Sequence, residues 1–307
     1  MNAFLSALGG KLAERWLSLL VLPGLLLLGA CVAGGGVLGH RHWNDVGRLR
    51  ARVDALAAEP AADDPGTILL VVSAVLLTAA ALGLAAQALG SVLEAWWTGD
   101  PADPAARRLA ARRRERWRVR EDALAAAERL KGEFRLGLQP EGAVEPSEED
   151  VARLRRERDR IAPMAPRRAT RGGDLMLAAA ERVRRRYGLS LATAWPRLWL
   201  ILPDPARSQV QAAQGAFGAA ARLGGWGAGY ALLGLWWWPG LLVAAAVWFT
   251  AWRRGRAAVE TLAVLVEASV DLYGHELAAR LRVDLPGGPL GRGTGEQVSR
   301  LLGKPDL

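Results

Sequence analysis

Residues that could carry chemistry are few and scattered in this chain. His275 follows Asp271 at the i, i+4 spacing that brings two side chains together on one helix face. Two potential ligands are too few for a metal site. We expect His40 and His42 on the opposite side of a membrane from His275. The single cysteine, Cys31, allows neither an intrachain disulfide nor a cysteine-cluster metal site. The sequence therefore predicts no metal and no cofactor.

Two short motifs resemble functional signatures. Arg171-Gly172-Gly173-Asp174 resembles a phosphate-binding turn, but it lacks the preceding strand and the lysine of a P-loop, so we predict a helix start there. Leu28-Gly29-Ala30-Cys31 resembles a bacterial lipobox, whose cysteine is lipidated after cleavage. The apolar run continues past Cys31, which favours an uncleaved span, and lipidation stays open as an alternative. No nucleophile-base pair, metal constellation or acidic dyad can be assembled, so we predict that the protein is not an enzyme.

Apolar and charged residues are segregated along the chain. Of 307 residues, 51% are hydrophobic and 23% charged, which fits neither an ordinary soluble protein nor a transporter made wholly of membrane helices. The apolar runs cover 17–39, 67–93 and 223–252, and none has an ionisable residue in its core, which counts against an ion-coupled transporter. The interval 98–216 is strongly basic. We attribute the net charge of +9 to the arginine excess of cytoplasmic segments and consider a nucleic-acid partner unlikely.

The run 223–252 poses a length problem. About thirty residues in one helix would measure about 45 Å, whereas a bilayer core is about 30 Å thick. Either one tilted helix kinks at Pro239, or the chain turns there and crosses twice. Arginines flank the run on both sides, which calls for an even number of crossings. We therefore predict a hairpin with Trp236, Trp237 and Trp238 at its outer tip, and the single pass remains the alternative.

These runs predict an all-α, polytopic membrane protein with two transmembrane helical hairpins, or four spans, and a helical cytoplasmic domain inserted between them. We expect a multi-pass protein of a bacterial plasma membrane with both termini in the cytoplasm. The predicted domains are an N-terminal transmembrane hairpin (1–97), a basic helical cytoplasmic domain (98–216), a C-terminal transmembrane hairpin (217–254), and a cytoplasmic amphipathic helix with a tail (255–307).

Small and aromatic residues mark candidate contacts of the spans. Gly225 and Gly229 form a GxxxG pair that serves either self-association or packing on the first hairpin. Gln87 either lines a pore or bonds a neighbouring helix. The candidate helix-packing residues are Gly35, Gly39, Gly83, Gly225 and Gly229. The candidate interfacial anchors are Trp96, Trp97, Trp195, Trp199, Trp236, Trp237, Trp238 and Trp252.

The basic domain reads as a series of helices. Ser147, three residues before Asp150, predicts an N-cap for a charged helix that ends near Ile161. A helix from Asp174 should stop at Gly188. The apolar segment 189–202 either fills the core of this domain or lies in the membrane interface. A later amphipathic helix, over about 257–282, should pack against the 174–202 region.

A run of arginines follows the second apolar segment. A polybasic stretch just cytoplasmic of a span is typical of contact with anionic inner-leaflet lipid, although a merely solvated face and a nucleic-acid patch are alternatives. The candidate lipid-contacting residues are Arg112, Arg113, Arg114 and Arg116.

Three motifs carry a family resemblance. Arg186-Tyr187-Gly188-Leu189, Trp195-Pro196-Arg197-Leu198-Trp199 and Leu202-Pro203-Asp204, followed by a Trp-Trp-Pro hairpin, resemble an uncharacterised bacterial multi-spanning membrane protein family. The resemblance covers about 167–281 and implies no activity or site residues.

Function is predicted from architecture alone. The leading hypothesis is a non-enzymatic membrane scaffold or anchored effector, whose basic domain meets a protein partner or the inner leaflet. The alternative is an oligomeric pore or channel-like protein, and a membrane enzyme ranks lowest.

Overall fold

The computed structural model describes residues 21–58, 64–98, 104–283 and 290–303. These residues form helices and no strand, which confirms the predicted all-α class. The chain divides into two compact units. We call residues 1–94 with 218–255 the apolar unit, and residues 95–217 with 256–307 the charged unit.

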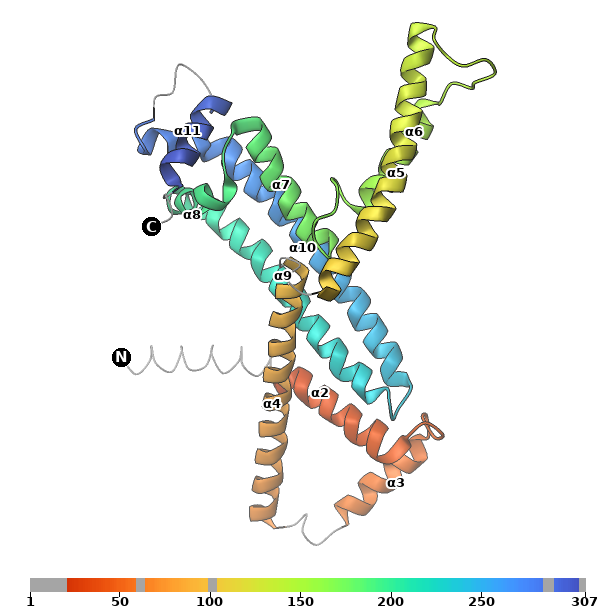
Figure 1. The fold of residues 1–307 in the computed structure, drawn as a ribbon. Coiled ribbons are helices and arrows are strands. Elements are labelled where there is room, and N and C mark those ends of the chain that lie inside the picture. Colours follow the sequence, from red (N-terminus) through yellow and green to blue (C-terminus); the bar gives the residue numbers. More distant parts are fainter. Residues whose placement is uncertain (1–20, 59–63, 99–103, 284–289, 304–307) are drawn as a thin grey trace. The chain divides into compact units, whose positions relative to one another are not determined.

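The apolar unit is built from an N-terminal group of helices and parts of two later ones (Figure 1). Helix α2 (Leu22–Ala30) continues into the π-helix η2 (Cys31–Leu38), followed by α3 (Val46–Ala57) and α4 (Pro65–Thr98). The C-terminal part of α9 (Asp204–Leu233) and the N-terminal part of α10 (Pro239–Arg280) complete this unit.

Helix α4 is, within the described residues, the one helix long and apolar enough to cross a membrane, over Pro65–Trp97. Only 11% of its most apolar stretch is buried, so most of its apolar surface faces outward, unlike that of a typical core helix. The apolar helix Leu22–Leu38 is shorter, and the first residues of the predicted span 17–39 lie outside the described residues. Length and composition thus support one span, and the four-span arrangement stays a prediction.

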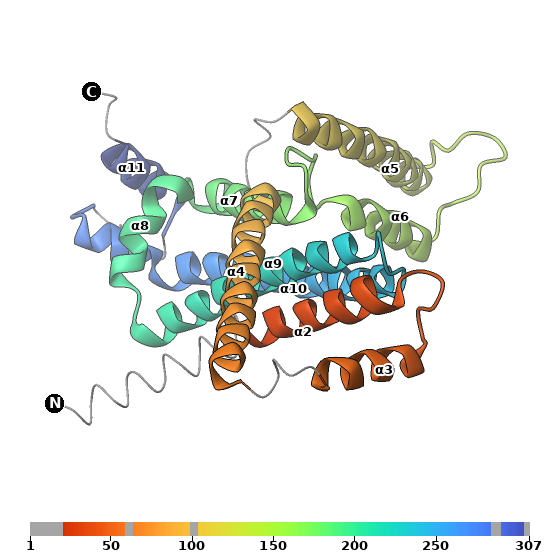
Figure 2. The same ribbon diagram turned by 90° about the horizontal axis from the view of Figure 1, so that it is seen from below.

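Helices α9 and α10 form an antiparallel hairpin that turns at residues 234–238 (Figure 2). Trp248 Nε1 donates a hydrogen bond to the Gly224 carbonyl at 3.1 Å, and the Leu241 side chain lies against Gly234. Pro239 begins α10, a position where its missing N–H leaves no hydrogen bond unmade. The chain therefore reverses at the tryptophan cluster, and a single helix kinked at Pro239 is not the geometry of this stretch.

The charged unit begins with two antiparallel helices, α5 (Pro104–Leu136) and α6 (Glu148–Ile161), joined by a loop (Figure 1). Ser147 Oγ accepts a hydrogen bond from the Asp150 amide, which confirms the predicted N-cap. Helix α7 (Arg171–Tyr187) is capped by Thr170 and so begins three residues earlier than predicted, but it ends as predicted at Gly188, whose φ is 67°.

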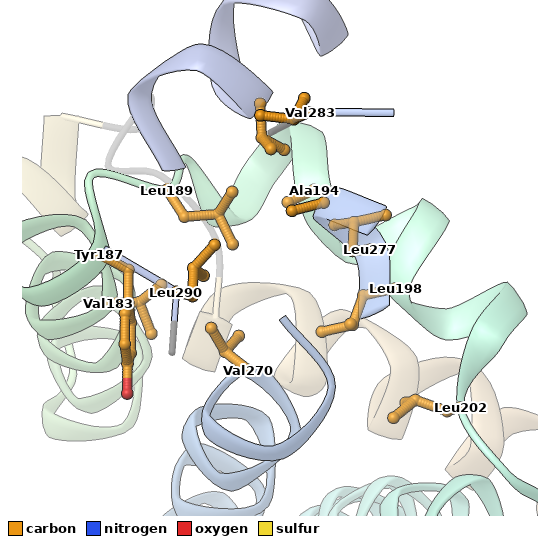
Figure 3. Packing of buried hydrophobic residues seen from close by; sticks show 12 residues of the cluster. Val183, Tyr187, Leu189, Ala194, Leu198, Leu202, Val270, Leu277, Val283 and Leu290 are labelled. Carbon is orange, nitrogen blue, oxygen red and sulfur yellow. The ribbon is translucent and has the colours of Figure 1, made fainter. Parts of the chain in front are cut away.

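The remaining helices of the charged unit enclose an apolar core (Figure 3). Helix α8 (Leu191–Ile201) contributes Ala194 and Leu198, α10 contributes Val270 and Leu277, and α11 (Arg292–Leu302) contributes Val298. The predicted helix at 257–282 is not separate, because α10 runs through its arginines without a break to Arg280. It packs with α7 and α8 as expected, and segment 189–202 fills the core.

Candidate functional site

A groove of about 370 Å³ lies along α7 and α10 in the charged unit. Val183 and Tyr187 of α7 pack with Val270 of α10 in the core. Because these apolar faces pack together, the polar residues beside them on both helices line the groove. Figure 3 shows the Tyr187 ring beside Val183, with its oxygen pointing away from the other labelled residues. The lining residues are Arg182, Val183, Arg185, Arg186, Tyr187, Glu267 and Asp271.

Polar side chains pair across this groove. Tyr187 Oη donates a hydrogen bond to Asp271 Oδ1 at 2.6 Å. The Arg182 Nε donates to both carboxylate oxygens of Glu267 at 3.0 Å, and an Arg182 terminal nitrogen adds a further bond. The Arg186 guanidinium lies 5.2 Å from the centre of the Tyr187 ring. Both acids are therefore engaged, and these contacts hold α7 against α10.

Tyr187→Phe tests this contact. Burial, followed by the neighbouring Asp271 carboxylate, raises the pKa of Tyr187. The neutral phenol therefore contributes stability that is complete below its ordinary pKa of about 10 and is lost as pH rises through the higher folded-state pKa. We expect the variant to lower the free energy of unfolding by about 1–2 kcal/mol at neutral pH and to lose less stability above pH of about 10. Denaturant unfolding of the full chain in detergent measures both effects.

Tyr273→Phe is the matched control, since Tyr273 packs against the same core and no hydrogen bond of its hydroxyl is seen within the described residues. An equal loss of stability in both variants would contradict a specific role for the Tyr187 hydroxyl.

A second polar cluster surrounds Asp174, which is 1% exposed. Asp174 Oδ2 accepts a hydrogen bond from Arg113 at 2.6 Å, and Oδ1 accepts from the amides of Arg167 and Arg168 at 2.9 Å each. Arg113 also donates to the Arg168 and Ile161 carbonyls. We call these residues the Asp174 hub. The hub ties α5 and the segment after α6 to the first turn of α7.

The hub corrects one predicted role. Arg113 was expected to contact lipid, but its side chain is only 19% exposed and its donors serve Asp174 and two carbonyls. Arg114 Nε likewise donates to the Pro166 carbonyl, at 3.1 Å. Arg112 and Arg116, by contrast, are exposed and form no ion pair in the described part of the chain. The predicted basic run thus separates into structural and surface residues.

Arg171 adds a partly buried charge beside the hub. Its terminal nitrogen donates to the Asp159 and Arg160 carbonyls, whereas its Nε has no acceptor within the described residues. Burial, followed by nearby Arg256, lowers the pKa of Arg171. The Arg171-Gly172-Gly173-Asp174 segment therefore forms the first turn of α7, as predicted, and its Arg171 side chain bonds to backbone carbonyls of the same chain.

The tryptophans predicted as interfacial anchors have different surroundings. Trp237 Nε1 donates to the Trp43 carbonyl at 3.2 Å, and the Trp238 ring meets the Trp43 ring edge-on at 5.0 Å. Trp236, Trp252 and Trp96 are more exposed, although Trp252 lies beside Phe249. In the charged unit, Trp97 packs against Phe217, while Trp195 and Trp199 pack against each other and the core.

Three of the predicted packing glycines face other helices or are buried. A Cβ on Gly225 would overlap the Ala86 carbonyl of α4, and one on Gly229 would lie 2.8 Å from Leu27 of α2. Gly83 is buried in α4, whereas Gln87 is exposed. The GxxxG pair therefore contacts other helices of the same chain.

The prediction for the other two glycines needs correction. Gly35 is exposed, with one ordinary contact to Leu233, and Gly39 ends η2 with φ of 60° and nothing within 4 Å of an added Cβ. The glycines that make close contacts in this region are Gly24, against the Ala79 backbone, and Gly34, against the Trp237 ring. Sequence reasoning missed both.

No three of the histidine, cysteine, aspartate and glutamate side chains in the described ranges are grouped so that they could hold a metal ion. His275 is exposed, and Asp271 pairs with Tyr187. Searches against protein-family models, curated proteins and solved structures found no match to this chain. The family resemblance therefore stays a prediction.

Proposed function

We propose that this chain is an integral protein of a bacterial plasma membrane, with four spans in two hairpins, and that it serves as a non-enzymatic scaffold or anchored effector. Both termini and the charged unit lie in the cytoplasm in this proposal. The charged unit is then the part that meets a partner.

One observation carries the proposal, namely the distribution of large and small residues in the apolar unit. The buried face of α4 consists of small residues, Ala79, Gly83, Ala86 and Gly90. Its large side chains point outward, with Leu70 73% exposed and Leu77 72% exposed. In water, large apolar side chains would be buried and small residues would be exposed. In lipid, leucine is well solvated, and helices are held together by the close backbone packing that small residues allow.

The α9–α10 hairpin shows the same distribution. Gly225 and Gly229 face α4 and α2, while outward positions carry Leu232, Leu242 and Phe249. The apolar arms, 223–233 of α9 and 239–252 of α10, measure only about 16 and 21 Å, so a full crossing requires local thinning of the bilayer. Because both glycines already contact helices of this chain, their surface is not free for a second copy. This favours the scaffold over the oligomeric pore.

Reporter fusions test the topology. Fusions after Pro65 and Pro239 should report the outside, and fusions after Gly99 and Leu307 should report the cytoplasm, because each hairpin returns the chain to its starting side. A C-terminus found outside would overturn the second hairpin. Liposomes containing the purified protein provide a separate test, since ion flux without an added partner would replace the scaffold proposal with the pore.

A further inference from the structure

The arginines of α5 divide between two faces of one helix. The inner face is fixed by the Asp174 hub, by a hydrogen bond from Trp117 Nε1 to the Ala162 carbonyl at 3.0 Å, and by buried Leu124. The outer face carries Arg108, Arg112 and Arg116, which we call the outer ridge. Their i, i+4, i+8 spacing aligns them over about 12 Å.

The outer ridge has unmatched positive charge. All three side chains belong to exposed residues, and no carboxylate in the described part of the chain forms an ion pair with any of them. Glu115, the acid between Arg112 and Arg116, lies 3.8 Å from Arg118 instead. Some other exposed arginines of the charged unit are paired, as Arg153 is with Asp150 and Arg155 with Glu128. The ridge is therefore a surface suited to an external anion.

Apolar side chains accompany this charge. Val119 is 59% exposed and lies one turn beyond Arg116, and Leu109 is also exposed beside Arg108. A helix face that combines arginines with exposed aliphatic residues suits a headgroup boundary, where guanidinium groups meet phosphates and aliphatic groups leave water. A nucleic acid would bind the arginines through its phosphates but would make no use of the exposed aliphatic residues beside them.

The chain itself keeps the beginning of α5, four residues before Arg108, close to the end of α4. Pro104, the first residue of α5, follows Thr98, the last residue of α4, by six positions, so the two helix ends are at most about 20 Å apart. In the proposed topology α4 ends at the cytoplasmic surface, where anionic lipids attract basic segments. The inner-face contacts preform the ridge, so docking does not require α5 to fold.

We propose that the outer ridge binds the anionic headgroups of the inner leaflet and thereby fixes α5 on the membrane surface. This inference rests on the proposed membrane function. Each arginine contributes about a fivefold preference for the anionic surface, so removing three shifts the docking equilibrium by about a hundredfold.

The test uses the full chain in nanodiscs of phosphatidylcholine, alone or mixed equally with phosphatidylglycerol. Cys31→Ser removes the native cysteine, and Val119→Cys places a fluorophore beside the ridge. Lipid carrying a nitroxide headgroup quenches the fluorophore on contact. We expect quenching in anionic discs, little in neutral discs, and its loss at high salt because the ridge is exposed.

Matched variants separate the ridge from total charge. Arg108→Gln with Arg112→Gln and Arg116→Gln should abolish the quenching, whereas Arg153→Gln with Arg155→Gln and Arg156→Gln removes equal charge from α6 and should preserve it. Equal quenching in neutral discs, or equal loss in both triple variants, would overturn the inference. The inference would also be overturned if the ridge variant kept its quenching in anionic discs but no longer bound single-stranded RNA. Release of the chain from membranes by alkaline carbonate would reject the membrane function as well, whereas stable insertion without quenching rejects the ridge alone.

Discussion

Asp174→Ala is expected to lower the free energy of unfolding by about 3–5 kcal/mol, the typical cost of removing one partner of a buried ion pair. The substitution leaves the Arg113 guanidinium partly buried without its carboxylate, and it leaves the amides of Arg167 and Arg168 without an acceptor. Thermal and denaturant unfolding of the full chain in detergent measure this loss. Near-ultraviolet circular dichroism reports on the surroundings of Trp117, whose indole nitrogen donates a hydrogen bond to the Ala162 carbonyl beside the hub.

Asp204→Ala is the matched control. Asp204 also pairs with an arginine, Arg207, but its side chain is 90% exposed, so the expected loss is below about 1 kcal/mol. Combining Asp174→Ala with Arg113→Leu should recover part of the stability, because no unpaired charge remains buried. Equal losses for Asp174→Ala and Asp204→Ala would show that the hub does not hold α5 to α7.

Local signals in the sequence were sufficient for helix ends. Ser147 and Gly188 act through bonds to backbone atoms a few residues away, so their roles follow from residue type and spacing. Asp174 was predicted only as part of a helix start. Its main partner, Arg113, lies 61 residues earlier, and no local pattern distinguishes that arginine from its neighbours. Helical periodicity does place Arg113 and Trp117 on one face, which was the available signal.

Packing in the apolar unit was predicted less well near the N-terminus. Gly35 and Gly39, two of the candidate packing residues, are four positions apart, the spacing that puts two residues on one face of an α-helix. Residues Cys31–Leu38 instead form a π-helix, whose i, i+5 bonding rotates successive side chains differently. As a result Gly34 meets Trp237. The GxxxG pair lies in a regular α-helix, and there the spacing correctly indicated a close helix contact.

Gly225→Leu should have the largest effect in the apolar unit, lowering stability by about 3 kcal/mol or more. An added Cβ would overlap the Ala86 carbonyl and lie 3.2 Å from the Gly90 amide nitrogen, and backbone atoms of α4 cannot move aside as a flexible side chain could. Helices α4 and α9 must therefore separate. Thermal unfolding in detergent, combined with protease sensitivity of α4, measures the effect.

Gly215→Leu is the control on the same helix. An added Cβ at Gly215 meets nothing within 4 Å, and leucine favours helix over glycine, so this variant should be neutral or more stable by up to about 1 kcal/mol. The two substitutions are chemically identical and only Gly225→Leu is predicted to destabilise the protein, so a general effect of leucine cannot produce the expected result. If Gly225→Leu were as stable as Gly215→Leu, α4 and α9 would not be in contact. The proposal of a four-span membrane protein rests on close packing between small residues, and it would then be without its main supporting contact.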